Sequence, residues 1–209
     1  MIRDLRSIGF TMEQIREYLE HHTVSSSLSM LEDEKEAITK QMQHLQKLQK
    51  NVEHRLNTIH SAFSLPLDEI HLMTLPPRHC HRLFERYKHE EEMDFLMKQL
   101  INLNQNRLYI IGSNQMGTMI SLPSLLKKKT LSYQSVFLID EEGADLIDGG
   151  DYLCVTYRGN YEQSAYWGQQ LAQYAHAHKF KIRGDLLEIL WIDIHTTSDE
   201  SEYITQLQL

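Results

Sequence analysis

The sequence is poor in cysteine, in proline and in long apolar runs. It has 2 cysteines and 4 prolines among 209 residues, and the two thiols, Cys80 and Cys154, cannot build a disulfide framework. We therefore expect a reducing, cytoplasmic compartment. No apolar stretch approaches the roughly 20 residues of a membrane-spanning helix, and residues 1–6 lack the apolar core of a signal peptide. These absences argue against a disulfide-rich secreted domain and against a membrane partner.

Motifs that carry common chemistries are also missing. The chain has no glycine-rich phosphate loop, no CxxC pair and no G-x-S-x-G nucleophile elbow. The segment His79-Cys80-His81 would put two imidazoles on one side of a strand, but two imidazoles alone do not complete a tetrahedral metal site. We expect no metal, no cofactor and no catalytic residue, so the chain is not predicted to be an enzyme.

Negative charge predominates, and it is concentrated in the second part of the chain. The formal net charge is −8. Residues 1–64 carry 8 Lys and Arg against 9 Asp and Glu, whereas residues 65–209 carry 13 against 20. Because phosphate contacts need clustered Lys and Arg, the acidic part is a poor surface for nucleic acid. It suits a cationic or neutral small ligand better, although acidic surfaces also keep proteins soluble.

The first segment reads as a helix pair. A short helix over residues 3–8 is predicted to stop at Gly9, which can adopt the left-handed cap conformation. Thr11 then opens a second helix, and Gln14 stands at the position that completes a capping box with it. The small polar residues 23–27 are predicted to form a hinge after this pair.

A heptad pattern follows the hinge. Apolar residues recur in alternating steps of three and four, which predicts one helix of roughly five heptads. Nine of the eleven positions of this seam are apolar: Leu28, Leu31, Lys35, Ile38, Met42, Leu45, Gln49, Val52, Leu56, Ile59 and Phe63. The segment Leu65-Pro66-Leu67 should end the helix, because proline disfavours helical geometry in the residue before it.

A single helix of this kind leaves its apolar seam in water, so it needs a partner. Dimerisation is the favoured interpretation, and packing on the chain's own domain is the alternative. The polar seam residues Lys35 and Gln49 would fix register. The residues predicted to form the dimer contact are Leu31, Ile38, Met42, Leu45, Val52, Leu56 and Ile59.

From about residue 70 the pattern becomes mixed. Helices are expected over 90–103 and 161–178, and loops over 127–131 and 141–150. The expected strands are 70–75, 79–87, 107–112, 116–121, 133–140, 151–158, 187–194 and 202–209. This region reads as a duplication, with two strand–helix–strand–strand units that could pair around a pseudo-twofold axis. A cleft between such halves is a natural small-ligand site.

One carboxylate stands in an apolar strand of the second unit. Glu188 lies in the run LLEILWI, where a charge is costly unless an opposite charge or hydrogen bonds compensate it. Side-chain alternation puts Glu188, Leu190 and Ile192 on one face. That face could line a cleft and meet a cationic ligand, or it could be open to water or paired with Lys or Arg.

Tyrosine is abundant in the same part of the chain. Aromatic faces around one carboxylate make a cation-binding pocket, but sheets favour aromatic residues anyway, and most of these residues should belong to the core. The aromatic residues considered are tyrosines 87, 109, 133, 152, 157, 161, 166, 174 and 203, with Phe137 and Trp191.

Two parts of the chain resemble known families. The stretch RDLRSIGFTMEQI at residues 3–15 resembles the last helix pair of the MerR-type DNA-binding domain, which leads into a long dimerisation helix. The second part resembles the GyrI-like effector-binding domain. That likeness rests on GDY at 150–152, YRGNY at 157–161, the strand of Glu188, and EYIT at 202–205.

The resemblance implies an α+β fold and a three-part chain. Residues 1–22 would be a remnant of the DNA-binding domain, 23–64 a dimerisation helix, and 65–209 a GyrI-like domain with the duplicated strand–helix–strand–strand pattern. It further implies a ligand-responsive transcription regulator that forms a homodimer through an antiparallel coiled coil.

The resemblance also implies a ligand site. In multidrug-binding members of the GyrI-like family a glutamate on the penultimate strand meets a cationic, lipophilic drug among aromatic residues, and Glu188 stands at the matching place. Tyr203 matches an aromatic position of that pocket, and Tyr87, Phe137 and Tyr166 match more weakly. Leu190 occupies a place where an aromatic residue is common.

The family pattern has one element that this chain does not match. Family members carry a winged helix-turn-helix before the segment that resembles residues 3–15, so we expect promoter binding only where that element is present. Two other functions remain open: a GyrI-like hydrolase in which Glu188 acts on water, and a protein that sequesters a ligand without binding DNA. The effector, the target promoter and the direction of regulation are not predicted.

Overall fold

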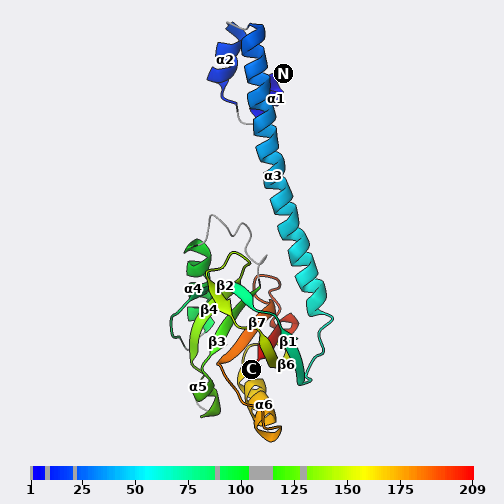
Figure 1. The fold of residues 1–209 in the computed structure, drawn as a ribbon, viewed down its shortest axis with the longest axis vertical. Helices are drawn as coiled ribbons and strands as arrows, with labels where there is room; N and C mark the ends of the chain where they lie inside the picture. Colours follow the sequence, from blue (N-terminus) through cyan, green and yellow to red (C-terminus); the bar gives the residue numbers. More distant parts are fainter. Residues whose placement is uncertain (1, 8–9, 21–22, 88–89, 104–114, 128–130) are drawn as a thin grey trace. The chain divides into compact units, whose positions relative to one another are not determined.

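The computed structural model describes the chain apart from residues 1, 8–9, 21–22, 88–89, 104–114 and 128–130 (Figure 1). It divides into two compact units, Met1–Val52 and Glu53–Leu209. Within the described residues, no helix combines the length and the apolar character needed to cross a bilayer.

The first unit holds a helix pair and most of a long helix. Its elements are α1 (Ile2–Ser7), α2 (Met12–Glu20) and the part of α3 (Val24–Ala62) that precedes residue 53. The predicted capping box is confirmed, because the Thr11 backbone N–H donates to Gln14 Oε1 at 2.9 Å and the Gln14 N–H donates to Thr11 Oγ1 at 3.2 Å. The predicted stop at Gly9 lies outside the described residues.

The predicted hinge over residues 23–27 is wrong for all but its first residue. A second capping pair starts the long helix there: the Ser26 N–H donates to Thr23 Oγ1 at 3.1 Å, and the Thr23 N–H donates to Ser26 Oγ at 2.7 Å. Small polar residues that suggested a hinge therefore cap α3 and form its first turn, since serine and threonine satisfy the free amides of a helix start.

The seam of α3 is exposed over most of its length in the single chain. Leu31, Ile38, Met42, Leu45, Val52 and Leu56 are all at least two-fifths exposed. The last turns pack on the second unit's core, where Ala62 and Ile59 contact Ile192 and Ile204. An exposed apolar stripe of this length indicates a surface that is buried against another helix or protein.

The second unit is built on one antiparallel sheet with the order β1-β6-β8-β7-β3-β4-β2-β5. Its helices are α4 (Glu90–Leu103), α5 (Leu122–Leu126), α6 (Gln163–Ala177) and the 3-10 turn η1 (Glu200–Glu202). The strands are β1 (His71–Leu75), β2 (Arg78–Leu83), β3 (Met116–Ile120), β4 (Tyr133–Ile139), β5 (Asp145–Ile147), β6 (Gly150–Arg158), β7 (Leu186–Ile192) and β8 (Ile204–Gln208).

The predicted duplication agrees with this topology. The units β2-α4-β3-β4 and β6-α6-β7-β8 place their strands so that the order β6-β8-β7-β3-β4-β2 reads the same from either end. The two units meet where β7 pairs with β3. Helix α4 packs on β4 and helix α6 on β6 (Figure 1). The α+β fold is thus confirmed.

Several predicted elements differ from the structure. Strand β2 ends at Leu83 rather than at residue 87, β5 lies within the loop predicted over 141–150, and α5 was not predicted. The strand predicted over 107–112 lies outside the described residues. Three-residue strands and five-residue helices carry too few periods to leave a sequence pattern.

The two faces of the sheet carry separate cores. One core gathers residues of α4 and α6 with Val136, Leu190 and Leu207. The other gathers Phe137, Leu187 and Ile189 with two further residues on the opposite face. The sheet curls around this second core, because Arg78 of β2 donates from Nη2 to Gln208 Oε1 of β8 at 2.8 Å although three strands separate β2 from β8 in the sheet.

Gly117 allows the central strands to pack closely. A Cβ at this position would lie 2.4 Å from Phe137 Cζ and 2.5 Å from the backbone oxygen of Glu188. Replacing Gly117 with alanine should therefore lower the free energy of unfolding by about 1–3 kcal/mol, the usual cost of overpacking, measured by urea denaturation. Gly184→Ala is the matched control, because a Cβ there would meet no atom of the described residues within 4 Å. Equal losses in the two variants would contradict the steric explanation.

Candidate functional site

A buried carboxylate lies at the junction of the two repeats. Glu188 on β7 pairs directly with Thr118 on β3, and its side chain is 1% exposed. It accepts hydrogen bonds from Thr118 Oγ1 at 2.8 Å and from Ser164 Oγ of α6. Ser164 Oγ also lies 2.6 Å from Tyr157 Oη. These hydroxyl groups orient the carboxylate.

Two stacked tyrosine pairs flank this carboxylate, one in each repeat. Tyr87 and Tyr133 stack with ring centroids 4.7 Å apart, and Tyr161 and Tyr203 stack at 5.3 Å. Burial raises the pKa of the Tyr87 and Tyr161 hydroxyls far above the usual value, and the nearby Glu188 carboxylate raises the pKa of both further. Both hydroxyls are therefore neutral and able to donate a hydrogen bond.

One of these hydroxyls is unsatisfied. Tyr161 Oη is buried and has no hydrogen-bond partner among the described residues, whereas the side chain of Thr118 lies near Tyr87 Oη and acts to lower its pKa. Leaving a buried donor unpaired costs about 1–3 kcal/mol. An acceptor atom on a bound ligand, or a water molecule, would accept a hydrogen bond from the hydroxyl group and recover that cost. The arrangement thus brings together a buried carboxylate, two stacked tyrosine pairs and the buried Tyr161 hydroxyl, and these groups could bind a small ligand.

The structure brings only some of the predicted ligand residues together. Glu188, Tyr203 and Tyr87 lie around one site. Phe137 lies on the opposite face of the sheet, because it pairs with Gly117, one residue away from the Thr118 position that faces the site. Tyr166 is 58% exposed and packs edge-on against Trp167. It stands two residues after Ser164, and residues two apart point away from each other on a helix.

Several residues of the site were not predicted to belong to it: Thr118, Tyr133, Tyr157, Tyr161 and Ser164. The duplication carried a usable signal for one of them. Tyr87 follows the first strand of the first repeat and Tyr161 follows the first strand of the second, so the two occupy equivalent places. Aligning the repeats would have added Tyr161. The hydroxyl partners of Glu188 depend on strand register, which the sequence pattern did not define.

A turn beside the site connects it to the end of α3. Asp193 is buried, and its Oδ1 accepts from the backbone N–H of His195 at 3.1 Å. Arg55 of α3 donates from Nη2 to the His195 carbonyl oxygen at 3.0 Å. Burial raises the pKa of the Asp193 carboxyl above its ordinary value, although His195 and Arg55 act in the opposite direction. Asp193 also contributes to the raised pKa of the Tyr161 hydroxyl.

This raised pKa predicts a pH-dependent stability. The folded state holds the Asp193 proton more tightly than the unfolded state, so the stability from this group is fully present below the unfolded pKa and is lost as pH rises through the folded pKa. Asp193→Asn keeps the Oδ1 acceptor and removes the charge. We expect the variant to be more stable than the wild type at neutral pH, with the gap closing as the pH falls toward about 4 in urea denaturation series. A gap that widens at low pH would contradict this assignment.

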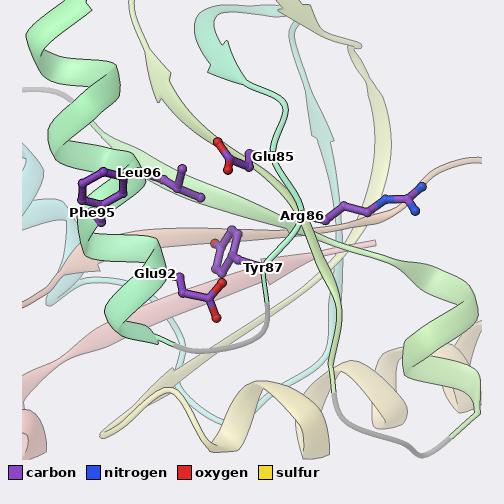
Figure 2. Close-up of a pocket in the computed structure, with 6 residues that line it drawn as sticks. All are labelled: Glu85, Arg86, Tyr87, Glu92, Phe95 and Leu96. Carbon is purple, nitrogen blue, oxygen red and sulfur yellow. The ribbon is translucent and has the colours of Figure 1, made fainter.

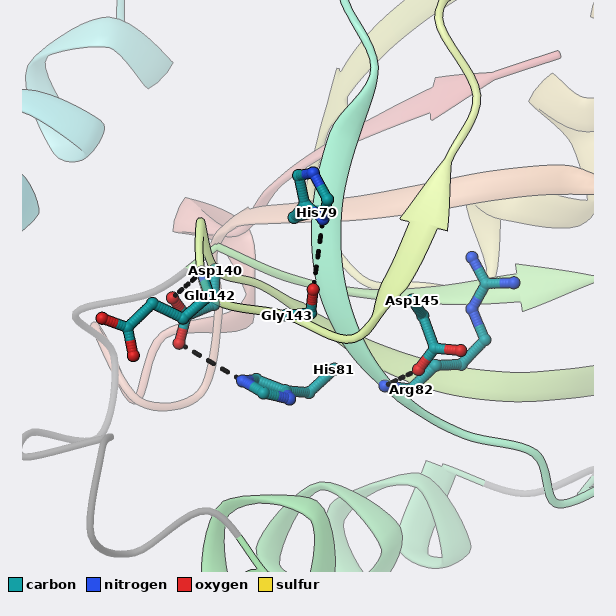
Figure 3. A network of polar contacts seen from close by, with 7 residues as sticks. All are labelled: His79, His81, Arg82, Asp140, Glu142, Gly143 and Asp145. Atoms are coloured by element: carbon teal, nitrogen blue, oxygen red, sulfur yellow. Dashed lines mark hydrogen bonds and ion pairs between the residues drawn. The ribbon is translucent and has the colours of Figure 1, made fainter.

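The histidines of the segment 79–81 contact the turn at residues 140–143 (Figure 3). His79 Nδ1 lies 3.1 Å from the Gly143 carbonyl oxygen, and His81 Nε2 lies 3.5 Å from Asp140 Oδ2. The Arg82 N–H donates to Asp145 Oδ2 at 3.1 Å. In the described part of the chain, no group of three His, Cys, Asp or Glu side chains is placed to hold a metal ion.

An open pocket of about 290 Å³ lies outside the buried site, with Tyr87 in its wall (Figure 2). Its lining comes from the segment after β2 and from the first half of α4. The lining residues are Glu85, Arg86, Tyr87, Glu92, Phe95 and Leu96.

Comparisons with known proteins agree with the two-part organisation. Residues 1–55 match the sequence family described as MerR, DNA binding. The fold is similar to EcmrR in the cryo-EM structure of its DNA complex, with 16% identity, a TM-score of 0.57, and coverage of 100% of this chain and 80% of that one. It is also similar to the EcmrR C-terminal domain, with 12% identity, a TM-score of 0.55, and coverage of 68% and 95%. A search of curated proteins found no significant match. Identities this low show the fold alone.

Proposed function

From an N-terminal segment that matches the MerR DNA-binding family, we propose that this chain is the dimerisation and effector-sensing portion of a MerR-type transcription regulator. In this proposal residues 1–22 belong to the DNA-binding part, 23–64 form the dimerisation helix, and 65–209 form the effector-binding domain. The effector is a small lipophilic cation, and Glu188 is its electrostatic anchor.

The observation that carries the proposal is the buried carboxylate between two tyrosine pairs. In a low-dielectric site a carboxylate interacts strongly with a cation that reaches it. The stacked pairs Tyr87–Tyr133 and Tyr161–Tyr203 come one from each repeat, and Tyr87 and Tyr161 lie near enough to Glu188 for its charge to raise their pKa. Aromatic faces and one carboxylate together favour a cation of low hydration, through cation–π attraction and ion pairing.

The dimer is supported by the exposed seam of α3. A partner helix would cover Leu31, Ile38, Met42, Leu45, Val52 and Leu56, as the heptad pattern predicts. Ile59 packs within its own chain, so it would stand at the margin of such a contact.

A contiguous set of contacts links the proposed site to the helix end. Tyr161 is electrostatically coupled to both Glu188 and Asp193, and the Asp193 turn is held to α3 by Arg55. A ligand that displaces the Tyr161 ring would therefore act on the turn that holds α3. The size of any resulting shift is limited by the difference in the ligand's affinity for the two states.

Titration of the intact protein with matched ligand pairs tests the proposal. Each pair consists of a lipophilic quaternary cation and its neutral carbon isostere, which have the same shape and differ in charge. We expect the cation to bind on the order of tenfold or more tightly than its isostere in calorimetric titrations. Equal affinities within every pair would exclude an electrostatic anchor in this site.

A further inference from the structure

We propose that residues 176–183, the end of α6 and the segment after it, bind single-stranded nucleic acid. We call these residues the basic tract. Its cationic side chains would contact phosphates, and the exposed ring of Phe180 would stack on an unpaired base. The tract lies at one extremity of the second unit, at the C-terminal end of α6 (Figure 1). The inference goes beyond the proposed effector site and does not depend on it.

Positive charge is concentrated in the basic tract although the second part of the chain is acidic. Residues 163–184 contain no Asp or Glu, and the tract holds the exposed cations Lys179, Lys181 and Arg183. In the part of the chain that the structure describes, none of the three forms an ion pair. The next acidic residue, Asp185, accepts at Oδ1 from the Leu122 backbone N–H at 2.9 Å, so it is directed toward the start of α5. Clustered, unpaired cations are the side chains that contact a phosphate backbone.

The backbone holds the tract in a defined turn. The Phe180 N–H donates to the Ala175 carbonyl oxygen at 2.9 Å and the Lys179 N–H to the His176 carbonyl oxygen at 3.2 Å, which is the Schellman arrangement of a helix end. Lys179 has a φ of 59°, in the left-handed region, where glycine is the usual residue. Because a lysine is unfavourable for the backbone there, its presence points to a use of its side chain. The helix dipole favours cations in the last turn, but the later cations of the tract lie beyond the helix.

Three stacked rings accompany these charges. Tyr174 and His178 stack with ring centroids 3.9 Å apart, and His178 and Phe180 stack at 6.1 Å. Tyr174 packs against the core of the second unit, as does Ile182 within the tract. His178 Nδ1 lies 2.9 Å from the Tyr174 carbonyl oxygen, which holds the middle ring in place. The outer ring, Phe180, is 47% exposed, so it presents aromatic surface that the two other rings support.

Charge and aromatic surface together favour one class of partner. Proteins that bind single strands combine cations along the backbone with aromatic rings on which unpaired bases stack. A duplex keeps its base faces within its own stack, so it would use only the charges. A lipid surface requires a larger apolar face than a single exposed ring, and an acidic peptide has no base to stack. Single-stranded DNA and RNA offer the same two groups, a phosphate and a base face.

Fluorescence anisotropy of labelled oligonucleotides of about 15 nucleotides tests the proposal on the full chain. The probes are oligodeoxythymidine, oligouridine and a DNA duplex of the same length, titrated over a range of salt concentrations. The variants are the basic-tract variant Lys179→Gly/Lys181→Gln/Arg183→Gln, the ring variant Phe180→Leu, the single variant Lys179→Gly, and the control Lys40→Gln/Lys50→Gln/Lys98→Gln, which removes the same charge from exposed lysines elsewhere. Thermal unfolding of each variant verifies its fold.

The wild type should bind both single strands more tightly than the duplex. The logarithm of its affinity should fall with the logarithm of the salt concentration with a slope of about −2, as expected for three phosphate contacts on a single strand. The basic-tract variant should lose on the order of tenfold or more and the ring variant about fivefold or more, whereas the control should keep its affinity. Lys179→Gly should weaken binding and yet unfold at the same temperature as the wild type or at a higher one, because glycine suits the left-handed turn.

Other results would overturn the proposal. If the duplex binds as tightly as the single strands and Phe180→Leu changes nothing, the tract is only a positive surface. Equal losses in the basic-tract variant and the control would assign binding to the net charge of the protein. Displacement of the probe by polyglutamate as effectively as by unlabelled oligonucleotide would indicate an acidic protein partner, and tighter binding to anionic lipid vesicles would indicate a membrane. None of these results bears on the proposed effector site, which is tested with cationic ligands.

Discussion

Replacing Glu188 with glutamine should weaken the binding of a lipophilic mono-cation by about 5- to 150-fold, the effect of losing an interaction of roughly 1–3 kcal/mol with a charged group. Glutamine keeps the shape of the side chain, and its amide oxygen can still accept from Thr118 Oγ1, which lies 2.8 Å from the wild-type carboxylate. The charge is lost, and the amide nitrogen takes the place of the oxygen that accepts from Ser164 Oγ, which must then act as the acceptor. A neutral isostere of the cation should therefore bind both proteins nearly equally, as calorimetric titration can show.

The appropriate control is Glu141→Gln, which makes the same chemical change at an exposed position on the turn after β4. It should leave every affinity unchanged. We also expect Glu188→Gln to unfold at the same temperature as the wild type or at a higher one, because a charge in a buried site opposes folding. If cations bind both proteins with the same affinity, Glu188 is not part of the site, and the likeness to effector-binding domains extends to the fold alone.

Replacing Leu45 and Val52 together with aspartate should convert a dimer into a monomer. Both side chains lie on the α3 seam and are more than half exposed in the single chain, so a partner helix would have to bury them. Each aspartate would bring a charge into an apolar contact at a cost of several kcal/mol, and two such losses exceed what a helix pair can tolerate. Sedimentation equilibrium should then give half of the wild-type mass.

The matched control puts the same charges on another face of the same helix. Gln43 and Asn57 are exposed, lie outside the predicted seam, and become aspartate with the same change in charge as Leu45 and Val52. This variant should remain dimeric. An unchanged mass for the Leu45→Asp/Val52→Asp protein would place the dimer contact elsewhere or show that the wild type is a monomer.

Features that depend on neighbours in the chain were predictable. The capping pair of Thr11 and Gln14 involves residues three apart, and the helix α3 follows from a period that repeats over many turns. The helix α4 has the bounds that its sequence pattern predicted. The duplication was visible for the same reason, because each repeat holds a long helix between strands of ordinary length. The 23–27 segment shows the limit, since serine and threonine favour both hinges and helix starts.

The ligand site depended on tertiary structure. The alternation of β7 by itself put Glu188 and Leu190 on one face, but it could not say that Thr118 would stand opposite Glu188 or that Ser164 would reach it from α6. Phe137 was also a predicted aromatic partner, on a weaker match than Tyr203. A register in which Phe137 pairs with Gly117 turns its ring to the other face of the sheet, because one residue of offset reverses a side chain. The sequence determined which residue types were available, and pairing between distant strands decided which of them meet at Glu188.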